Sequence, residues 1–99
     1  MSVYEQMLDN KNDRTNRLRA IETLGRYAAN PGEYATAFRE AAADPDELVR
    51  ATALRGIGAI GQRVPSLISE FEKAIQAGLR DPQIRVRVEA VEDVAQFRA

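Results

Sequence analysis

A motif that recurs along the chain constrains its fold more than any other feature of the sequence. Residues 44–58 (DPDELVRATALRGIG) align without gaps on residues 81–95 (DPQIRVRVEAVEDVA). A weaker copy around Arg17, which corresponds to Arg50, precedes both of them. The positions matched in the two clearer copies are Asp44/Asp81, Pro45/Pro82, Val49/Val86, Arg50/Arg87, Ala53/Ala90, Leu54/Val91 and Ile57/Val94. A motif repeated at intervals of roughly 35 residues indicates stacked supersecondary units that share one core.

The apolar residues recur at helical spacing along almost the whole chain. Within residues 67–79 they fall every three or four positions, as in a helix with one buried face. The segment IRVRVEAV, residues 84–91, begins like an alternating strand, but its apolar pattern continues at helical spacing as far as Phe97. We therefore predict an all-α fold.

Proline and capping residues divide the chain at regular places. Residues 30–32 (NPG) end one helix and start the next, because proline is favoured in a first helical turn. Asp44 is suited to cap a helix whose first residue is Pro45, and Asp81-Pro82 repeats this start signal. The resulting prediction is six helices, near residues 2–9, 13–29, 31–43, 45–61, 65–79 and 82–97.

The connections between these helices are short, so neighbouring helices should pack antiparallel as three pairs. A chain of 99 residues is long enough for one modest hydrophobic core. We therefore expect a single domain over residues 1–99, with repeats at about 1–30, 31–62 and 63–99.

The repeated motif resembles a known pattern. An Asp-Pro turn, then Val-Arg, then alanine and aliphatic residues ending in Ile-Gly, is similar to the HEAT repeat in its short bacterial and archaeal form. The first unit is the least regular, since Lys11 and Asn16 stand where Asp and Val are expected, and terminal repeats are often atypical. The resemblance implies a right-handed α-solenoid of three antiparallel helix pairs.

The resemblance also implies a role for the repeated charged residues. In HEAT proteins the Asp of the turn and the Arg six residues later commonly form a ladder between successive repeats. Here the ladder residues would be Asp44, Arg50, Asp81 and Arg87, with Arg17 at the end. Because buried charges are tolerated only when paired and hydrogen-bonded, we interpret these arginines as structural and not as ligand-binding.

The second helix of each pair should line the concave face, which is the usual binding surface of a solenoid. The repeat alignment predicts that its outward-facing, partner-binding residues are Arg19, Glu22, Arg26, Arg55, Val88, Glu89, Glu92 and Asp93. This face changes from basic at its N-terminal end to acidic at its C-terminal end. For any one of these residues, a solvated charged surface is an equally good reading.

The last predicted helix carries two apolar stripes. One consists of Ile84, Val88, Val91 and Ala95, and the other of Val86, Ala90, Val94 and Phe97. A terminal helix has only one neighbouring layer to cover it, so two stripes indicate a further contact. A second copy of the chain, a partner protein, or crowded packing within a small domain would each account for it.

The amino-acid composition argues against most enzyme classes. The chain has no Cys, no His and no Trp, so thiolate nucleophiles, the commonest zinc ligand and the commonest general base near neutral pH are all missing. Glycines at 56, 58 and 61 lack the Lys-Ser/Thr that follows in a phosphate loop. Glu89, Glu92 and Asp93 fit an exposed helix face better than acid–base catalysis. We expect no enzymatic activity, no cofactor and no metal.

The sequence thus favours a protein-interaction module of the adaptor, scaffold or inhibitor kind, whose partner is not identified. The alternative is binding to a nucleic-acid backbone through the arginine-rich N-terminal half: Arg14, Arg17, Arg19, Arg26 and Arg55. A net charge of −1 supplies no overall attraction to nucleic acid or to anionic lipid. Residues 1–9 lack a secretory pattern and no apolar run could span a bilayer, so we expect a cytoplasmic protein without a membrane partner.

Overall fold

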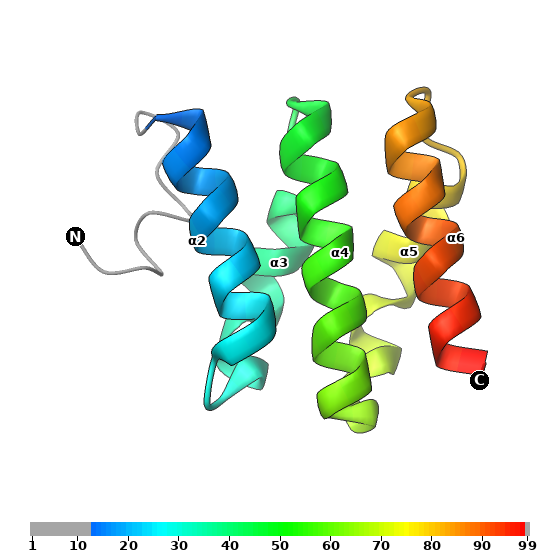
Figure 1. Cartoon of the computed structure of the whole chain (residues 1–99). Coiled ribbons are helices and arrows are strands. Elements are labelled where there is room, and N and C mark those ends of the chain that lie inside the picture. Colours follow the sequence, from blue (N-terminus) through cyan, green and yellow to red (C-terminus); the bar gives the residue numbers. More distant parts are fainter. Residues whose placement is uncertain (1–12, 99) are drawn as a thin grey trace.

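The structure, a computed structural model, describes residues 13–98 of the chain (Figure 1). The helix predicted near 2–9 lies outside the described residues. The described helices are α2 (Arg14–Tyr27), η1 (Pro31–Tyr34), α3 (Ala35–Ala41), α4 (Glu47–Arg63), η2 (Pro65–Phe71), α5 (Glu72–Leu79) and α6 (Ile84–Arg98), where η denotes a 3₁₀ helix. No strand occurs between residues 13 and 98. The prediction of an all-α fold is confirmed.

The helices form two layers. In Figure 1, α2, α4 and α6 lie side by side and run in the same direction, while α3 and α5 lie behind them and run the opposite way. The middle helix α4 packs against α2 on one side and α6 on the other, and α3 and α5 support the layer from behind. The Cα atoms span 36 × 31 × 16 Å, a slab two helices thick. This stack of antiparallel pairs is an α-solenoid.

The helices α4 and α6 begin two residues later than predicted, because Asp44 and Asp81 form turns before the helices. Asp46, and not Asp44, caps α4, since its side chain accepts a hydrogen bond from the N–H of Leu48. Asp44 Oδ1 accepts from the N–H of Asp46 at 2.9 Å, which closes a small turn before the helix. Asp81 Oδ1 accepts from the N–H of Gln83 in the same way. The repeated Asp-Pro is therefore a turn that precedes the helix.

The helices predicted over 31–43 and 65–79 are each divided. Each starts as a 3₁₀ helix at a proline, Pro31 or Pro65, and becomes α-helical after an aromatic residue. These aromatic residues, Tyr34 and Phe71, have φ near −105° and ψ near 0°, outside the usual α-helical values. Over one or two turns the apolar spacing of a 3₁₀ helix resembles that of an α-helix, so the sequence pattern did not separate the two.

The two N-terminal helices of the front layer approach each other through glycine. A Cβ atom on Gly25 of α2 would lie 2.7 Å from the Cα atom of Gly56 of α4, closer than van der Waals contact allows. Arg63, at the end of α4, then caps the end of α2 by donating to the carbonyl oxygens of Ala28 (2.8 Å) and Gly25 (2.7 Å). These contacts fix α2 and α4 at close range.

Substituting Gly25 with alanine is expected to destabilise the domain by about 2 kcal/mol, because the new methyl group meets the backbone of α4, which has no room to yield. The better helix propensity of alanine offsets only ~1 kcal/mol of a larger packing cost. Chemical denaturation of both proteins measures the difference. Gly32→Ala is the matched control, since its Cβ would make only an ordinary contact with Leu67 at 3.8 Å. Equal stabilities of the two variants would contradict the close approach.

Candidate functional site

The repeated charged residues lie at one end of the α2–α4–α6 layer and link successive repeats. Arg17 Nη2 donates to Asp44 Oδ2 at 3.0 Å, and Arg50 Nε donates to Asp81 Oδ2 at 2.8 Å. A second Arg50 nitrogen donates to Asp81 Oδ1 at 3.0 Å, so this pair is bidentate. Arg50 also donates to the carbonyl oxygen of Asp44, and Arg87 donates to that of Asp81. Each arginine therefore holds a turn, and Arg17 and Arg50 each pair with the aspartate of the next repeat.

These ladder side chains are largely buried, with exposed fractions of 15% for Arg50 and 9% for Asp81. The hydrogen bond from Arg50 holds the pKa of Asp81 below its ordinary value, and the same bond raises the pKa of Arg50. Both groups are thus charged and already satisfied within the fold. Their geometry supports a structural role and leaves them little capacity for a ligand.

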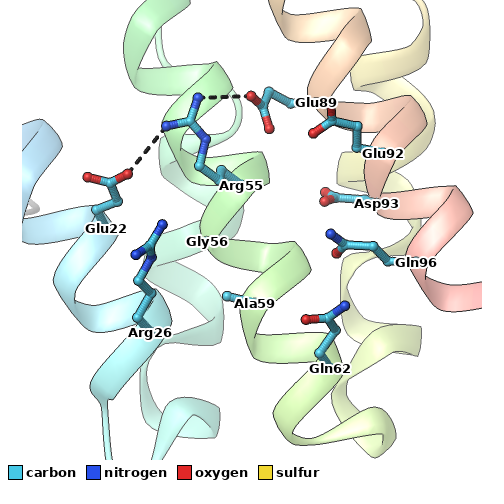
Figure 2. Close-up of a pocket in the computed structure, with 10 residues that line it drawn as sticks. All are labelled: Glu22, Arg26, Arg55, Gly56, Ala59, Gln62, Glu89, Glu92, Asp93 and Gln96. Atoms are coloured by element: carbon cyan, nitrogen blue, oxygen red, sulfur yellow. Dashed lines mark hydrogen bonds and ion pairs between the residues drawn. The ribbon is translucent and has the colours of Figure 1, made fainter.

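A second set of ion pairs crosses the exposed face of the α2–α4–α6 layer, which the sequence predicted to be the concave face. Arg55, in the middle of α4, donates to Glu22 of α2 at 3.3 Å and to Glu89 of α6 at 2.9 Å (Figure 2). Both glutamates raise the pKa of Arg55, Glu89 more strongly through its hydrogen bond. The guanidinium is half exposed, so these pairs contribute little to stability. They connect all three helices of the front layer at one level.

Next to this bridge, a pocket of about 250 Å³ opens between α2, α4 and α6 (Figure 2). Its floor on α4 includes Gly56 and Ala59, and the short side chain of Ala59 occupies little of the space. The lining residues are Glu22, Arg26, Arg55, Gly56, Ala59, Gln62, Glu89, Glu92, Asp93 and Gln96. On the α2 side, Glu22 is paired with Arg55, and Arg26 supplies the remaining charge; the carboxyl groups of Glu92 and Asp93 stand on the α6 side. The α2 side is called the basic wall and the α6 side the acidic wall.

The burial of Asp93 differs from the prediction. It was expected to face outward, yet only 2% of it is exposed, because α6 packs its carboxyl group against Gly58 of α4. A Cβ atom on Gly58 would collide with Asp93 Oδ1 and would lie 3.0 Å from Gln96 Oε1. Asp93 Oδ2 is buried and has no hydrogen-bond partner among residues 13–98. Burial, and then the charges of Glu89 and Glu92, raise the pKa of Asp93 to about 8.

The other residues predicted for the concave face divide into two groups. The pocket brings together five of them besides Asp93: Glu22, Arg26, Arg55, Glu89 and Glu92. Arg19 is exposed on α2 but does not line the pocket, and Val88 lies on a separate stripe of α6. Sequence reasoning missed Gln62 and Gln96, although Gln96 follows Glu89 and Glu92 on the same helical face.

The two apolar stripes of α6 have different surroundings. Val86 and Ala90 are buried, and Val94 and Phe97 pack against the core. On the other stripe, Ile84, Val88 and Val91 are exposed by 69%, 46% and 55%. A shallow apolar groove lies between α5 and the end of α6, lined in part by Ile75, Leu79, Val94 and Phe97. The exposed stripe and this groove are called the α6 end surface below.

Some kinds of site are missing from the part of the chain that the structure describes. Residues 13–98 contain no group of three or more acidic, His or Cys side chains that could hold a metal ion. None of the described helices is long and apolar enough to cross a membrane.

The fold and the repeated Asp–Arg contacts define an α-solenoid built from short helix pairs. The family model for HEAT repeats matches residues 2–78, which is most of the chain. The chain therefore belongs to the HEAT-repeat family, as the sequence motif indicated. Proteins of this family generally mediate protein–protein interactions and are typically not enzymes. No curated protein matches the chain.

Proposed function

We propose that this domain, with three repeats over residues 1–99, is a non-catalytic interaction module. It would act as an adaptor, scaffold or inhibitor that binds a protein through the concave face and the α6 end surface. The observation that carries the proposal is the pocket of about 250 Å³ on the concave face, with basic and acidic walls that present unpaired polar groups.

The way in which the face is held supports this proposal. The ladder pairs Arg17–Asp44 and Arg50–Asp81 join successive repeats, and Arg55 bridges α2 and α6. A surface fixed in this manner loses little conformational freedom on binding, which favours affinity. The α6 end surface adds exposed apolar area, and such patches often mark contacts with another protein or a second copy.

The ion pairs weigh against the nucleic-acid alternative. Of the five arginines considered for phosphate binding, Arg14 pairs with Asp46 at 2.7 Å, and Arg17 and Arg55 are paired as described above. A surface for nucleic acid requires basic groups free to contact successive phosphates. Three of the five arginines are matched by carboxylates within the fold, which leaves Arg19 and Arg26 for such contacts.

A capture experiment tests the proposal. The full chain is used as bait in a lysate of the source organism. It is expected to retain a protein, and this retention should persist after nuclease treatment. Retention should fall by about tenfold with Arg26→Glu, which inverts the basic wall of the pocket, or with Val91→Ser, which interrupts the α6 end surface. The matched control is Arg80→Glu, an equal change of charge on an exposed residue at the end of α5.

The outcomes separate the two functions. Retention by both site variants equal to that of the Arg80→Glu control contradicts the proposed surfaces. Material lost on nuclease treatment, with binding that weakens steeply as salt is added, supports nucleic-acid binding instead.

A further inference from the structure

The acidic wall of the pocket contains a buried carboxyl oxygen that no donor of the described residues reaches. Asp93 Oδ2 is buried without a partner, and Figure 2 shows the carboxyl group of Asp93 pointing from α6 toward the pocket. Native folds seldom leave a buried polar group unpaired, because desolvation without a replacement bond is costly. In its carboxylate form, this group would be satisfied by a ligand that donates hydrogen bonds.

We propose that this wall binds an arginine side chain of the partner protein, which donates to the carboxyl groups of Asp93 and Glu92 and to the amide oxygen of Gln96. The inference rests on the proposed function, since it gives the chemistry by which the concave face would recognise a protein.

The neighbours of Asp93 favour a cation. Glu92 has no ion pair within the described part of the chain, whereas Glu89 already accepts from Arg55 at 2.9 Å. Gln96 Oε1 lies beside Asp93 Oδ1 at the position over Gly58. The side-chain oxygens of Glu92, Asp93 and Gln96 thus lie close together on α6. No cationic side chain among the described residues forms an ion pair with either carboxyl group.

The shape of the pocket favours a guanidinium group. The planar guanidinium has five N–H donors in a fixed fork, so it can bridge acceptors on several residues, whereas a lysine ammonium is a compact point charge. The pocket, at about 250 Å³, is smaller than the usual 300–1,000 Å³ of sites for drug-sized ligands, and it fits one long side chain. Ala59, on the floor, leaves room for the aliphatic part of that side chain.

The opposite wall adds selectivity. Arg26 lines the pocket from α2 and has no ion pair with another described residue. It would repel a second basic group and attract an acidic one. A partner segment with an arginine for the α6 wall and an acidic residue for Arg26 therefore matches the pocket best.

Binding should depend on pH. The charged groups around Asp93 are Glu89 and Glu92 on α6, Arg55 on α4, and Glu22 and Arg26 on α2, while α5 contributes none to this pocket. With a pKa of about 8, the carboxyl group of Asp93 holds a proton at neutral pH. A bound guanidinium favours the carboxylate, so binding releases this proton. The affinity for arginine should then fall as the pH is lowered below 8, by at most about tenfold per pH unit.

The test uses Nα-acetyl-arginine methylamide as the probe, titrated into the full chain and followed by two-dimensional NMR of the backbone amides. The citrulline analogue is the control probe, because it has the same shape without the charge. We expect the arginine probe to bind with a millimolar Kd and to shift signals near Gln62 and residues 92–96. The citrulline analogue should bind at least about tenfold more weakly, since a charge-assisted bond is lost. Equal binding of the two probes, or no shift with the arginine probe, would overturn the proposal.

Four variants locate the site. Glu92→Gln and Asp93→Asn should each weaken the arginine probe, and only Asp93→Asn should remove the pH dependence below 8. Ala59→Leu should block the pocket without removing a polar group, whereas Ala77→Leu, on an exposed position of α5, is the control and should bind normally. Unchanged binding in Ala59→Leu would place the probe elsewhere and so contradict the site.

This inference and the proposed function can fail separately. If Arg26→Glu or Val91→Ser abolishes capture of a protein while Glu92→Gln and Asp93→Asn capture it normally, the module stands and the arginine site is wrong. Suppose instead that the arginine probe binds the acidic wall as expected, but the bait captures no protein whose retention depends on either surface after nuclease treatment. The arginine site then stands and the interaction function is wrong.

Discussion

Replacing Arg50 with alanine is expected to lower the free energy of unfolding by about 3 kcal/mol, the cost of breaking a mostly buried charge pair. Arg50 donates to both carboxylate oxygens of Asp81 and to the carbonyl oxygens of Asp44 and Pro45. Truncation would leave the Asp81 carboxylate without the cation that donates to it, and the turn before α4 would lose two hydrogen bonds to its carbonyl oxygens. Chemical denaturation near neutral pH measures the loss, and thermal denaturation should show a clearly lower Tm.

The pH dependence of this loss identifies its cause. The pKa of Asp81 lies below its ordinary value because Arg50 donates to it, so the stabilisation is fully present above that ordinary value, 3.8. It disappears as the pH falls through the lowered pKa of the folded state. The difference between wild type and Arg50→Ala should therefore shrink in acid. Arg50→Lys keeps the charge but loses the bidentate geometry, and it should fall between the two proteins.

Arg14→Ala is the control for this prediction. Arg14 also pairs with an aspartate, Asp46, but on the exposed surface, where ion pairs contribute little. Its Tm should hardly change. An unchanged Tm in Arg50→Ala as well would mean that the ladder does not stabilise the fold.

Much of the fold could be predicted from the sequence, because equivalent positions of a repeated motif adopt the same local structure. Copies of one motif placed Asp44 and Asp81 in equivalent turns, and helical spacing identified the helices between them. The details that failed are ones that local pattern does not encode. Asp44 and Asp46 are both suitable caps by residue type, but the Asp44 carboxylate accepts from the N–H of Asp46 and from Arg17 of the preceding repeat, and Asp46 caps the helix.

The candidate site was less predictable, because a pocket depends on small side chains that leave space as much as on the charged side chains around it. The repeat alignment identified charged residues such as Arg26 and Glu92 that line the pocket. Ala59 contributes only a methyl group to the floor of the hollow, and nothing in a single helix marks such a small residue as the floor of a pocket. Asp93 was misplaced for the same reason, since its burial requires that its neighbour across the helix interface be Gly58.

The second large effect is expected at Asp93, and it has the opposite sign. Replacing Asp93 with asparagine should make the domain more stable near neutral pH. The pKa of Asp93 is about 8 in the folded state, against an ordinary value of 3.8. Between these values the unfolded chain loses the proton while the folded chain keeps it, so stability falls with rising pH by about 1.4 kcal/mol per unit. Near pH 7 the accumulated loss is on the order of 4 kcal/mol.

Asparagine has nearly the same shape and does not ionise, so the variant should lack this slope. Its stability should be close to that of the wild type below the ordinary pKa of 3.8, where Asp93 is protonated in both the folded and the unfolded chain, and should exceed it increasingly up to about pH 8. Urea denaturation at a series of pH values measures both curves. Glu92→Gln is the control, since Glu92 is exposed and its removal should leave most of the slope in place. Parallel curves for the wild type and Asp93→Asn would show that the carboxyl group is ionised and solvated in the folded protein.

The sign of this effect bears on function. If Asp93 served only to pack α6 against α4, a neutral residue of the same shape would be the better choice at that position. A carboxyl group that costs stability is understandable when the same group is needed for binding, because functional sites commonly reduce stability. Asp93→Asn should therefore unfold at higher urea concentrations than the wild type and yet bind the arginine probe more weakly. A variant that gained stability and kept its full affinity would separate the buried carboxyl group from the binding site.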